Sequence, residues 1–80
     1  PLLVGDALLV PYAKGALTAY GVEDGTMKWQ FRTEGAIRSA PTLVDGKVYF
    51  GSDDDYVYCI DAETGDRIWR SNSQKRDQPL

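Results

Sequence analysis

The chain has 80 residues, a size at which a single hydrophobic core is marginal without partners or cross-links. Its hydrophobic fraction of 42% is ordinary for a globular chain, and its net charge of −3 argues against a surface for nucleic acid or anionic lipid. It has no histidine, the commonest metal ligand and general base, and its single cysteine, Cys59, cannot form an intrachain disulfide.

Short strand-like runs alternate with turn residues in the first half of the chain. Turns are expected at Gly5-Asp6, Lys14-Gly15 and Asp24-Gly25, where glycine permits backbone angles closed to other residues. No stretch holds a helical stripe of apolar residues long enough to favour a helix. The expected strands are 2–4, 7–12, 17–20 and 27–31.

The second half has the same organisation with stronger turn signals. Asp45-Gly46 is typical of a type I′ hairpin turn, since both central residues of that turn need positive φ. The run 56–60 is apolar enough to be covered on both faces, and Cys59 within it is interpreted as a buried, inert thiol. The expected strands are 42–44, 47–50, 56–60 and 67–70.

The two halves are copies of one pattern. Six identities, among them Trp29 with Trp69, recur at a constant offset of 40 residues. We therefore expect two units, 1–40 and 41–80, each a four-stranded antiparallel meander. A four-stranded unit of about 40 residues is the signature of a β-propeller blade, so the predicted fold class is all-β. WD-type, kelch, immunoglobulin-like and β-helix alternatives fit less well, because they need other motifs or other periods.

The segment 59–69, Cys-Ile-Asp-Ala-Glu-Thr-Gly-Asp-Arg-Ile-Trp, resembles the tryptophan-docking motif of quinoprotein-like (PQQ-type) propellers. The first copy keeps only Ala19, Gly25 and Trp29 of that motif. The resemblance implies that Trp29 and Trp69 dock between neighbouring blades. An indole there buries a large apolar area while its N–H finds a carbonyl. Stacking of these rings on a ligand is the alternative interpretation.

Function in propellers is carried by loops at one face, here expected at 12–15, 33–39 and 52–55. Asp53, Asp54 and Asp55 could attract calcium, which the resemblance associates with pyrroloquinoline quinone, but they lack the alternating spacing of a calcium loop. A solvated turn is the favoured interpretation. Arg38 could pair with an anionic ligand such as a quinone carboxylate, although a surface ion pair is the simpler interpretation.

Other candidates for chemistry are weaker. Tyr49, Tyr56 and Tyr58 could form an aromatic binding strip, but strand alternation favours core packing for them. The sequence shows no catalytic site, no metal site and no identifiable cofactor-binding residues.

The chain is expected to need further blades. Two repeats are too few for a closed ring of about six to eight blades, and residues 75–80 resemble a shortened version of 37–42, as if a third blade began there. These blades would come from the rest of a longer chain or from self-association.

Three functions remain open at this point. The leading hypothesis is a portion of a propeller that serves as a protein- or ligand-binding scaffold. The alternatives are part of a dehydrogenase that uses pyrroloquinoline quinone and calcium, and the sensor domain of a receptor or kinase. The resemblance implies an extracytoplasmic location, although the chain shows no signal peptide. No nucleic-acid partner and no membrane insertion are expected.

Overall fold

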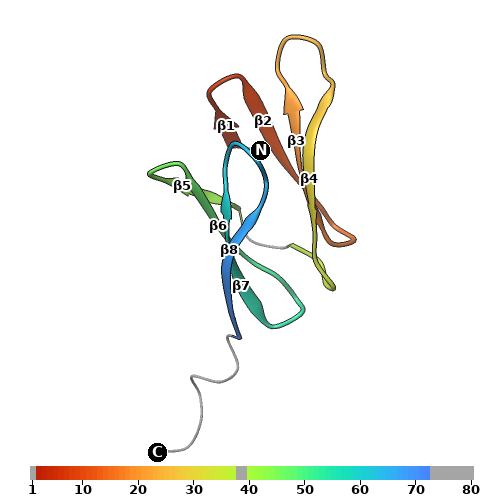
Figure 1. The fold of residues 1–80 in the computed structure, drawn as a ribbon. Coiled ribbons are helices and arrows are strands. Elements are labelled where there is room, and N and C mark those ends of the chain that lie inside the picture. Colours follow the sequence, from red (N-terminus) through yellow and green to blue (C-terminus); the bar gives the residue numbers. More distant parts are fainter. Residues whose placement is uncertain (1, 38–39, 73–80) are drawn as a thin grey trace, which may run out of the picture.

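The computed structural model describes residues 2–37 and 40–72, and within them the chain forms two four-stranded sheets (Figure 1). Each sheet is an antiparallel meander in which sequential strands are neighbours, which confirms the predicted all-β fold. The first contains β1 (Leu2–Val4), β2 (Ala7–Tyr12), β3 (Ala16–Gly21) and β4 (Met27–Arg32). The second contains β5 (Thr42–Val44), β6 (Lys47–Gly51), β7 (Tyr56–Asp61) and β8 (Arg67–Asn72).

The turns form where the glycines predict them. Asp45 and Gly46 both adopt positive φ, of 51° and 76°, as a type I′ hairpin requires. Several strands are a residue or two longer than predicted, because the ladders continue through polar residues such as Arg32 and Asn72. Strand pairing therefore extends beyond the apolar runs that identify the strands in the sequence.

One irregularity recurs in both sheets. The register between the third and fourth strands shifts at Ala19/Tyr20 in the first sheet and at Cys59/Ile60 in the second. The shift leaves Trp29 opposite Ala19 and Trp69 opposite Cys59. Both tryptophans thus have the same position relative to their own sheet.

The hydrophobic core lies between the two sheets. Strand alternation places apolar residues of each sheet on the face toward the other sheet. The Phe31 ring of the first sheet meets Phe50 and Tyr58 of the second edge-on, with centroids 6.0 and 5.3 Å apart. The buried residues of this cluster are Ala7, Leu9, Leu17, Ala19, Trp29, Ile37, Val48, Phe50, Tyr58, Ile60 and Ala62. A single sheet has no second layer of its own, so the shared core is what holds these strands together.

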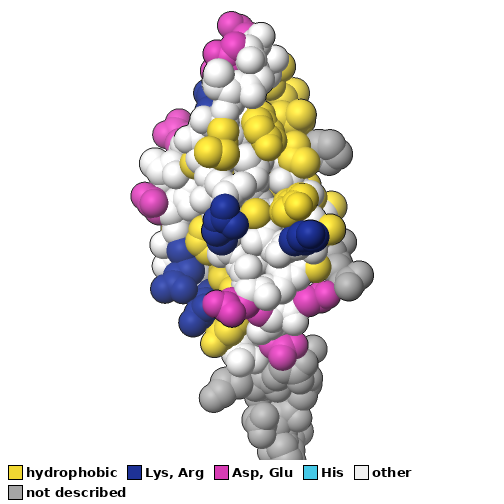
Figure 2. Space-filling view, turned by 90° about the vertical axis from the view of Figure 1, so that its right-hand side faces the viewer, with side chains coloured by type: hydrophobic (Ala, Val, Ile, Leu, Met, Phe, Trp, Pro, Cys, Tyr) yellow, Lys and Arg dark blue, Asp and Glu magenta, His cyan; other side chains and the backbone are white. Residues whose placement is uncertain are grey.

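The outward faces carry exposed apolar side chains. On the first sheet, Leu3, Tyr20 and Met27 lie on the face away from the core, and hydrophobic side chains gather in the upper part of Figure 2. On the second sheet, Val57 and Trp69 lie on the corresponding outward face. Apolar surface of this kind marks a contact with another layer of structure. Within residues 2–37 and 40–72 there is no helix with the length and apolarity needed to cross a membrane.

Candidate functional site

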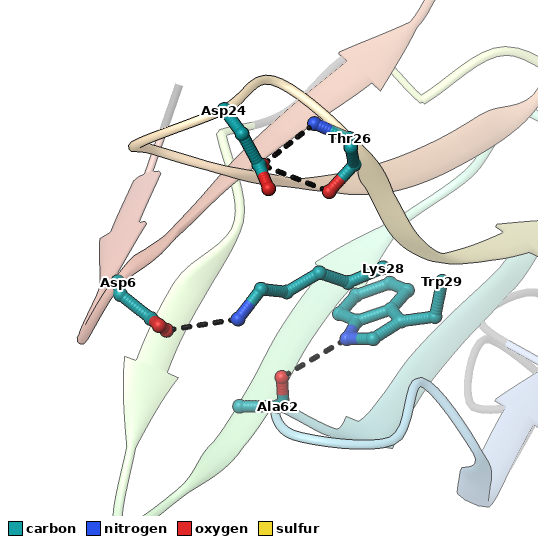
Figure 3. Close-up of polar contacts among 6 residues, drawn as sticks. All are labelled: Asp6, Asp24, Thr26, Lys28, Trp29 and Ala62. Atoms are coloured by element: carbon teal, nitrogen blue, oxygen red, sulfur yellow. Dashed lines mark hydrogen bonds and ion pairs between the residues drawn. The ribbon is translucent and has the colours of Figure 1, made fainter.

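Trp29 joins the two sheets at one end of their interface. Its indole reaches from β4 to the β7–β8 turn, where Nε1 donates a hydrogen bond of 3.2 Å to the carbonyl oxygen of Ala62 (Figure 3). The ring is 9% exposed, so this donor is paired inside the interface. The expectation that this tryptophan docks between repeats is confirmed.

Gly65 provides the surface on which the Trp29 ring rests. Its φ of 79° lies in the left-handed region, and a Cβ atom built on it would come within 2.5 Å of the Trp29 Cδ2 atom. Glycine is therefore required for two reasons: the turn needs positive φ, and the ring contacts the backbone directly.

Figure 3 also shows two polar contacts in the turns of the first sheet. The Lys28 ammonium lies 3.0 Å from Asp6 Oδ1, linking β4 to the β1–β2 turn of its own sheet. Asp24 Oδ1 accepts hydrogen bonds from the amide and the hydroxyl of Thr26, which close the β3–β4 turn. These exposed contacts stabilise turns within the first sheet. The hydrogen bond from Trp29 to Ala62 is the one in this view that joins the two sheets.

Three loops meet at the other end of the interface, as the meander topology predicts. The Thr33 amide donates to the Gly15 carbonyl at 2.9 Å, and the Asp53 amide donates to the Ala36 carbonyl at 2.8 Å. The Ser52 hydroxyl donates to the Gly35 carbonyl at 3.0 Å. We call residues 12–15, 33–37 and 52–55 the loop surface. Backbone hydrogen bonds join its three segments into one continuous surface.

Asp54 is the centre of this loop surface. Its Oδ1 accepts from the Tyr56 amide at 3.0 Å, and its Oδ2 accepts from the Glu34 amide at 3.2 Å and the Tyr58 hydroxyl at 2.5 Å. Burial raises the pKa of this carboxyl, but the hydrogen bonds from Tyr58, Glu34 and Tyr56 outweigh that effect and hold the pKa below its ordinary value. Asp54 therefore joins the two sheets as an ionised acceptor.

The expectation of a solvated turn at 53–55 is wrong for its middle residue. Asp53 and Asp55 are exposed, whereas Asp54 is half-buried and bonded to the segment that follows β4. Two of its donors, the Tyr56 amide and the Tyr58 hydroxyl, lie close in the sequence. An aspartate two residues before a strand is a local signal for the first of these bonds. The third donor, Glu34, is twenty positions away and could not be identified without the fold.

The predicted core packing is confirmed for Tyr58 and Tyr56 and is wrong for Tyr49. Tyr58 is buried against Phe31 and Phe50, and Tyr56 lies beside it on the same face of the sheet. Tyr49 lies on the opposite face with Trp69, their ring centroids 6.0 Å apart. Cys59 is buried, as predicted. Arg38 and the segment 75–80 lie outside the described residues.

Some side chains of the loop surface are exposed to solvent and free to contact a partner protein. Tyr12 is about half exposed, and Lys14 and Glu34 of the same surface are also exposed. The backbone that carries them is fixed by the hydrogen bonds described above. An exposed aromatic ring and exposed charges of both signs, on a backbone held by hydrogen bonds, are suited to contact with another protein.

The loop surface does not fit a calcium ion, the metal that the resemblance to quinoprotein-like propellers associates with pyrroloquinoline quinone. Both carboxylate oxygens of Asp54 already accept hydrogen bonds from protein donors. Among residues 2–37 and 40–72, no three acidic or cysteine side chains gather closely enough to hold a metal ion. No step of quinone chemistry is assigned to these residues.

Sequence comparisons identify relatives that cover most of the chain. A family model described as outer membrane protein assembly factor BamB matches residues 1–80. The chain is 35% identical over 75 residues to outer membrane protein assembly factor BamB of Vibrio cholerae, a match that covers 88% of the chain and 19% of that protein. It is 27% identical over 77 residues to polyvinylalcohol dehydrogenase of a Sphingopyxis species, covering 86% of the chain and 12% of that protein. The chain thus spans less than a fifth of the length of these curated relatives.

A solved structure shares the arrangement of the two sheets. Quinohemoprotein alcohol dehydrogenase from Comamonas testosteroni superimposes with a TM-score of 0.85 and 22% identity, covering 99% of this chain and 13% of that one. This likeness shows the fold: the two meanders are β-propeller blades. With the family model matched from end to end and Trp29 seated on Gly65, the chain belongs to the quinoprotein-like (PQQ-type) propeller repeat family.

Proposed function

We propose that these blades belong to a propeller that acts as a scaffold for other proteins and uses the loop surface to contact them. The observation that carries the proposal is the cross-linking of three loops from two blades by backbone hydrogen bonds and by Asp54. Loops held in this way lose little conformational entropy when a partner binds. The exposed ring of Tyr12 supplies the kind of side chain that dominates protein interfaces.

The relatives support the same role. The Vibrio cholerae relative is named as an assembly factor for outer membrane proteins, which is a role exercised on other proteins. We further propose an extracytoplasmic location for this chain, in keeping with that name. The further blades needed to complete the ring belong either to the same polypeptide or to other copies of it.

Site-specific photocrosslinking in the full-length protein tests the scaffold role. A photoreactive amino acid is placed at position 12 or 34 on the loop surface, with position 23, an exposed residue of the opposite turns, as the control. The expected result is one protein, identified by mass spectrometry, that is captured from positions 12 and 34 and absent at position 23. Capture that is equal at all three positions, or absent from the loop surface, would contradict the proposal.

A quinone-dependent dehydrogenase is the second candidate, because the Sphingopyxis relative is a dehydrogenase of 27% identity. Under this hypothesis the residues that bind quinone and calcium lie in other blades. Reduction of an artificial electron acceptor by the full-length protein, measured with and without pyrroloquinoline quinone and calcium, separates the two functions. A scaffold shows no quinone-dependent reduction, whatever alcohol is offered.

A further inference from the structure

A groove of about 730 Å³ runs between the outermost strands of the two blades. One wall is the end of β4 with Thr33 and Glu34, and the other is β8. The rings of Phe31 and Tyr58 form its apolar lining. Both walls belong to this chain, so further blades are not needed to form the groove.

Two arginines of β8 line the groove from the same side. Arg67 pairs with Ile60 and Arg70 with Tyr58 in the β7–β8 ladder, so both lie on the face of the sheet that packs against the first blade. Ile68 occupies the irregular position between them, and this is why residues three apart share one face. The two guanidinium groups therefore form a positively charged border along the β8 side of the apolar interface.

The blade architecture does not require these arginines. At an offset of 40 residues, the first blade has Met27 where the second has Arg67, and Gln30 where the second has Arg70. The same strand with the same bulge thus forms with neutral side chains at both positions. By contrast, the position of the docking tryptophan is identical in the two copies, as Trp29 and Trp69.

The charges in the groove are arranged to receive an anion. The Arg70 guanidinium carbon lies 4.0 Å from the centroid of the Tyr56 ring, which holds the side chain in place. Arg67 makes no ion pair with any residue in 2–37 or 40–72. Arg32 also lines the groove, and the carboxylates there are those of Glu34 and Asp66. Arg32 pairs with Ala16, on the face of β4 opposite Phe31, so Arg67 and Arg70 are the positive charges that face the groove.

The edge of β8 adds backbone hydrogen-bonding capacity. Among the described strands, β8 is the last of its sheet and pairs only with β7. Its outer edge therefore presents N–H and C=O groups, a row on which an added strand can pair. A segment laid there in extended form would place alternate side chains toward Arg67 and Arg70.

We propose that the groove between β4 and β8 binds an extended acidic segment of a partner protein, whose carboxylates pair with Arg67 and Arg70. This inference rests on the proposed role as a protein scaffold and adds a second contact surface, which adjoins the loop surface at Thr33 and Glu34. Charge complementarity selects the acidic segment, and the free edge of β8 selects its extended conformation.

Binding of short peptides to the full-length protein tests the inference directly. The probe is a fluorescein-labelled peptide of alternating Glu and Val, followed by fluorescence anisotropy, with a Gln-Val peptide of equal length as its neutral counterpart. We expect the Glu-Val peptide to bind at low salt, more tightly than the Gln-Val peptide, and to weaken as salt is raised. Equal binding of both peptides, or no binding of the Glu-Val peptide, would overturn the inference.

Variants that copy the first blade locate the binding. Arg67→Met and Arg70→Gln introduce the residues that the first blade has at those positions, so the strand is expected to stay intact, which circular dichroism verifies. Each is expected to weaken binding about threefold, and the two together about tenfold. The control is Lys47→Gln, which removes one positive charge outside the groove. A loss for Lys47→Gln as large as that for Arg70→Gln would show a non-specific charge effect and overturn the assignment.

The peptide assay and the crosslinking assay fail independently. Peptide binding that depends on the arginines, without any protein captured from position 12, which lies outside the groove, would keep the groove and reject the loop surface as the contact. Capture from position 12 without peptide binding would reject the groove alone.

Discussion

Trp29 and Trp69 occupy the same position in two copies of one repeat, yet their surroundings differ. Trp29 is 9% exposed, because the second blade offers Gly65 for its ring and the Ala62 carbonyl for its N–H. Trp69 is 43% exposed in this chain, with Tyr49 of its own sheet as its aromatic neighbour. The acceptor side shows the same contrast, since a Cβ atom on Gly25 would meet nothing within 4 Å.

The contrast shows where the stability of such a chain resides. Each blade contains the same strands and turns, but a tryptophan contributes its full burial only where the following blade supplies an acceptor. The junction between the blades, and not the blade itself, is the unit that becomes buried. Single substitutions can change one side of that junction at a time.

The largest effect is expected when the docked tryptophan is removed. In the 80-residue chain, Trp29→Ala should lower the free energy of unfolding by about 3–5 kcal/mol, because it leaves a cavity and orphans the Ala62 carbonyl. Trp69→Ala should cost about 1 kcal/mol, since much of that ring is already in water. Urea denaturation followed by far-ultraviolet circular dichroism measures both. Equal losses would mean that Trp29 owes its stabilising effect to its own sheet.

The acceptor side can be tested with a matched pair of glycines. Gly65→Ala and Gly25→Ala both place a side chain at positive φ, which costs about 1–2 kcal/mol. Gly65→Ala must also displace the Trp29 ring, raising its expected cost to about 2–4 kcal/mol. The same denaturation experiment gives the difference between the two variants. If that difference were zero, the contact between ring and backbone would contribute nothing to stability.

The loop end of the junction should be sensitive to one carboxylate. Asp54→Asn replaces an acceptor of three hydrogen bonds and should lower the unfolding free energy by about 1–3 kcal/mol. Asp45 is exposed and has positive φ, a conformation that asparagine adopts as readily as aspartate. Asp45→Asn should therefore change the unfolding free energy little. Because the folded-state pKa of Asp54 is lowered, its stabilisation is present above the ordinary aspartate pKa and is lost as the pH falls through the lowered value. Acid titration of both variants would reveal whether that loss disappears only in Asp54→Asn.

The smallest effect concerns the phenol that donates to Asp54. Burial, reinforced by the hydrogen bond to Asp54, raises the pKa of Tyr58 to about 12. A group whose folded pKa is raised contributes stability below its unfolded pKa, so this contribution should decline as the pH rises from about 10 to about 12. Ultraviolet difference spectroscopy should show one tyrosine that titrates after the others. Its disappearance in Tyr58→Phe would assign it, whereas its persistence would assign it to another tyrosine.

The strands and turns were accessible from the sequence because their signals are local. Asp45-Gly46 specifies a turn by itself, and alternation assigns Tyr56 and Tyr58 to one face of a sheet. The docking of Trp29 was accessible for another reason: a residue repeated at the same point of two units is expected to do the same job in each. The division into units 1–40 and 41–80 stays a prediction.

The contacts between blades were harder to anticipate. Asp54 looks like its two neighbours in the sequence, and its role depends on the Glu34 amide, which the fold alone brings near. The groove arginines are similar, because an exposed Arg67 is unremarkable until β4 is known to lie opposite it. Local patterns specify the elements, but the geometry between two elements follows from the packing of both.

The junction around Trp29 has a further consequence for how such proteins change in length. The contact is directional: each copy of the repeat carries a tryptophan on one side and an acceptor glycine on the other, so donor and acceptor are inherited together. Duplication or deletion of one whole copy therefore leaves no donor without an acceptor, and the number of copies can change without redesign of any contact. A ring assembled from such units can gain or lose members by recombination alone, provided that the rotation between neighbours still closes the circle.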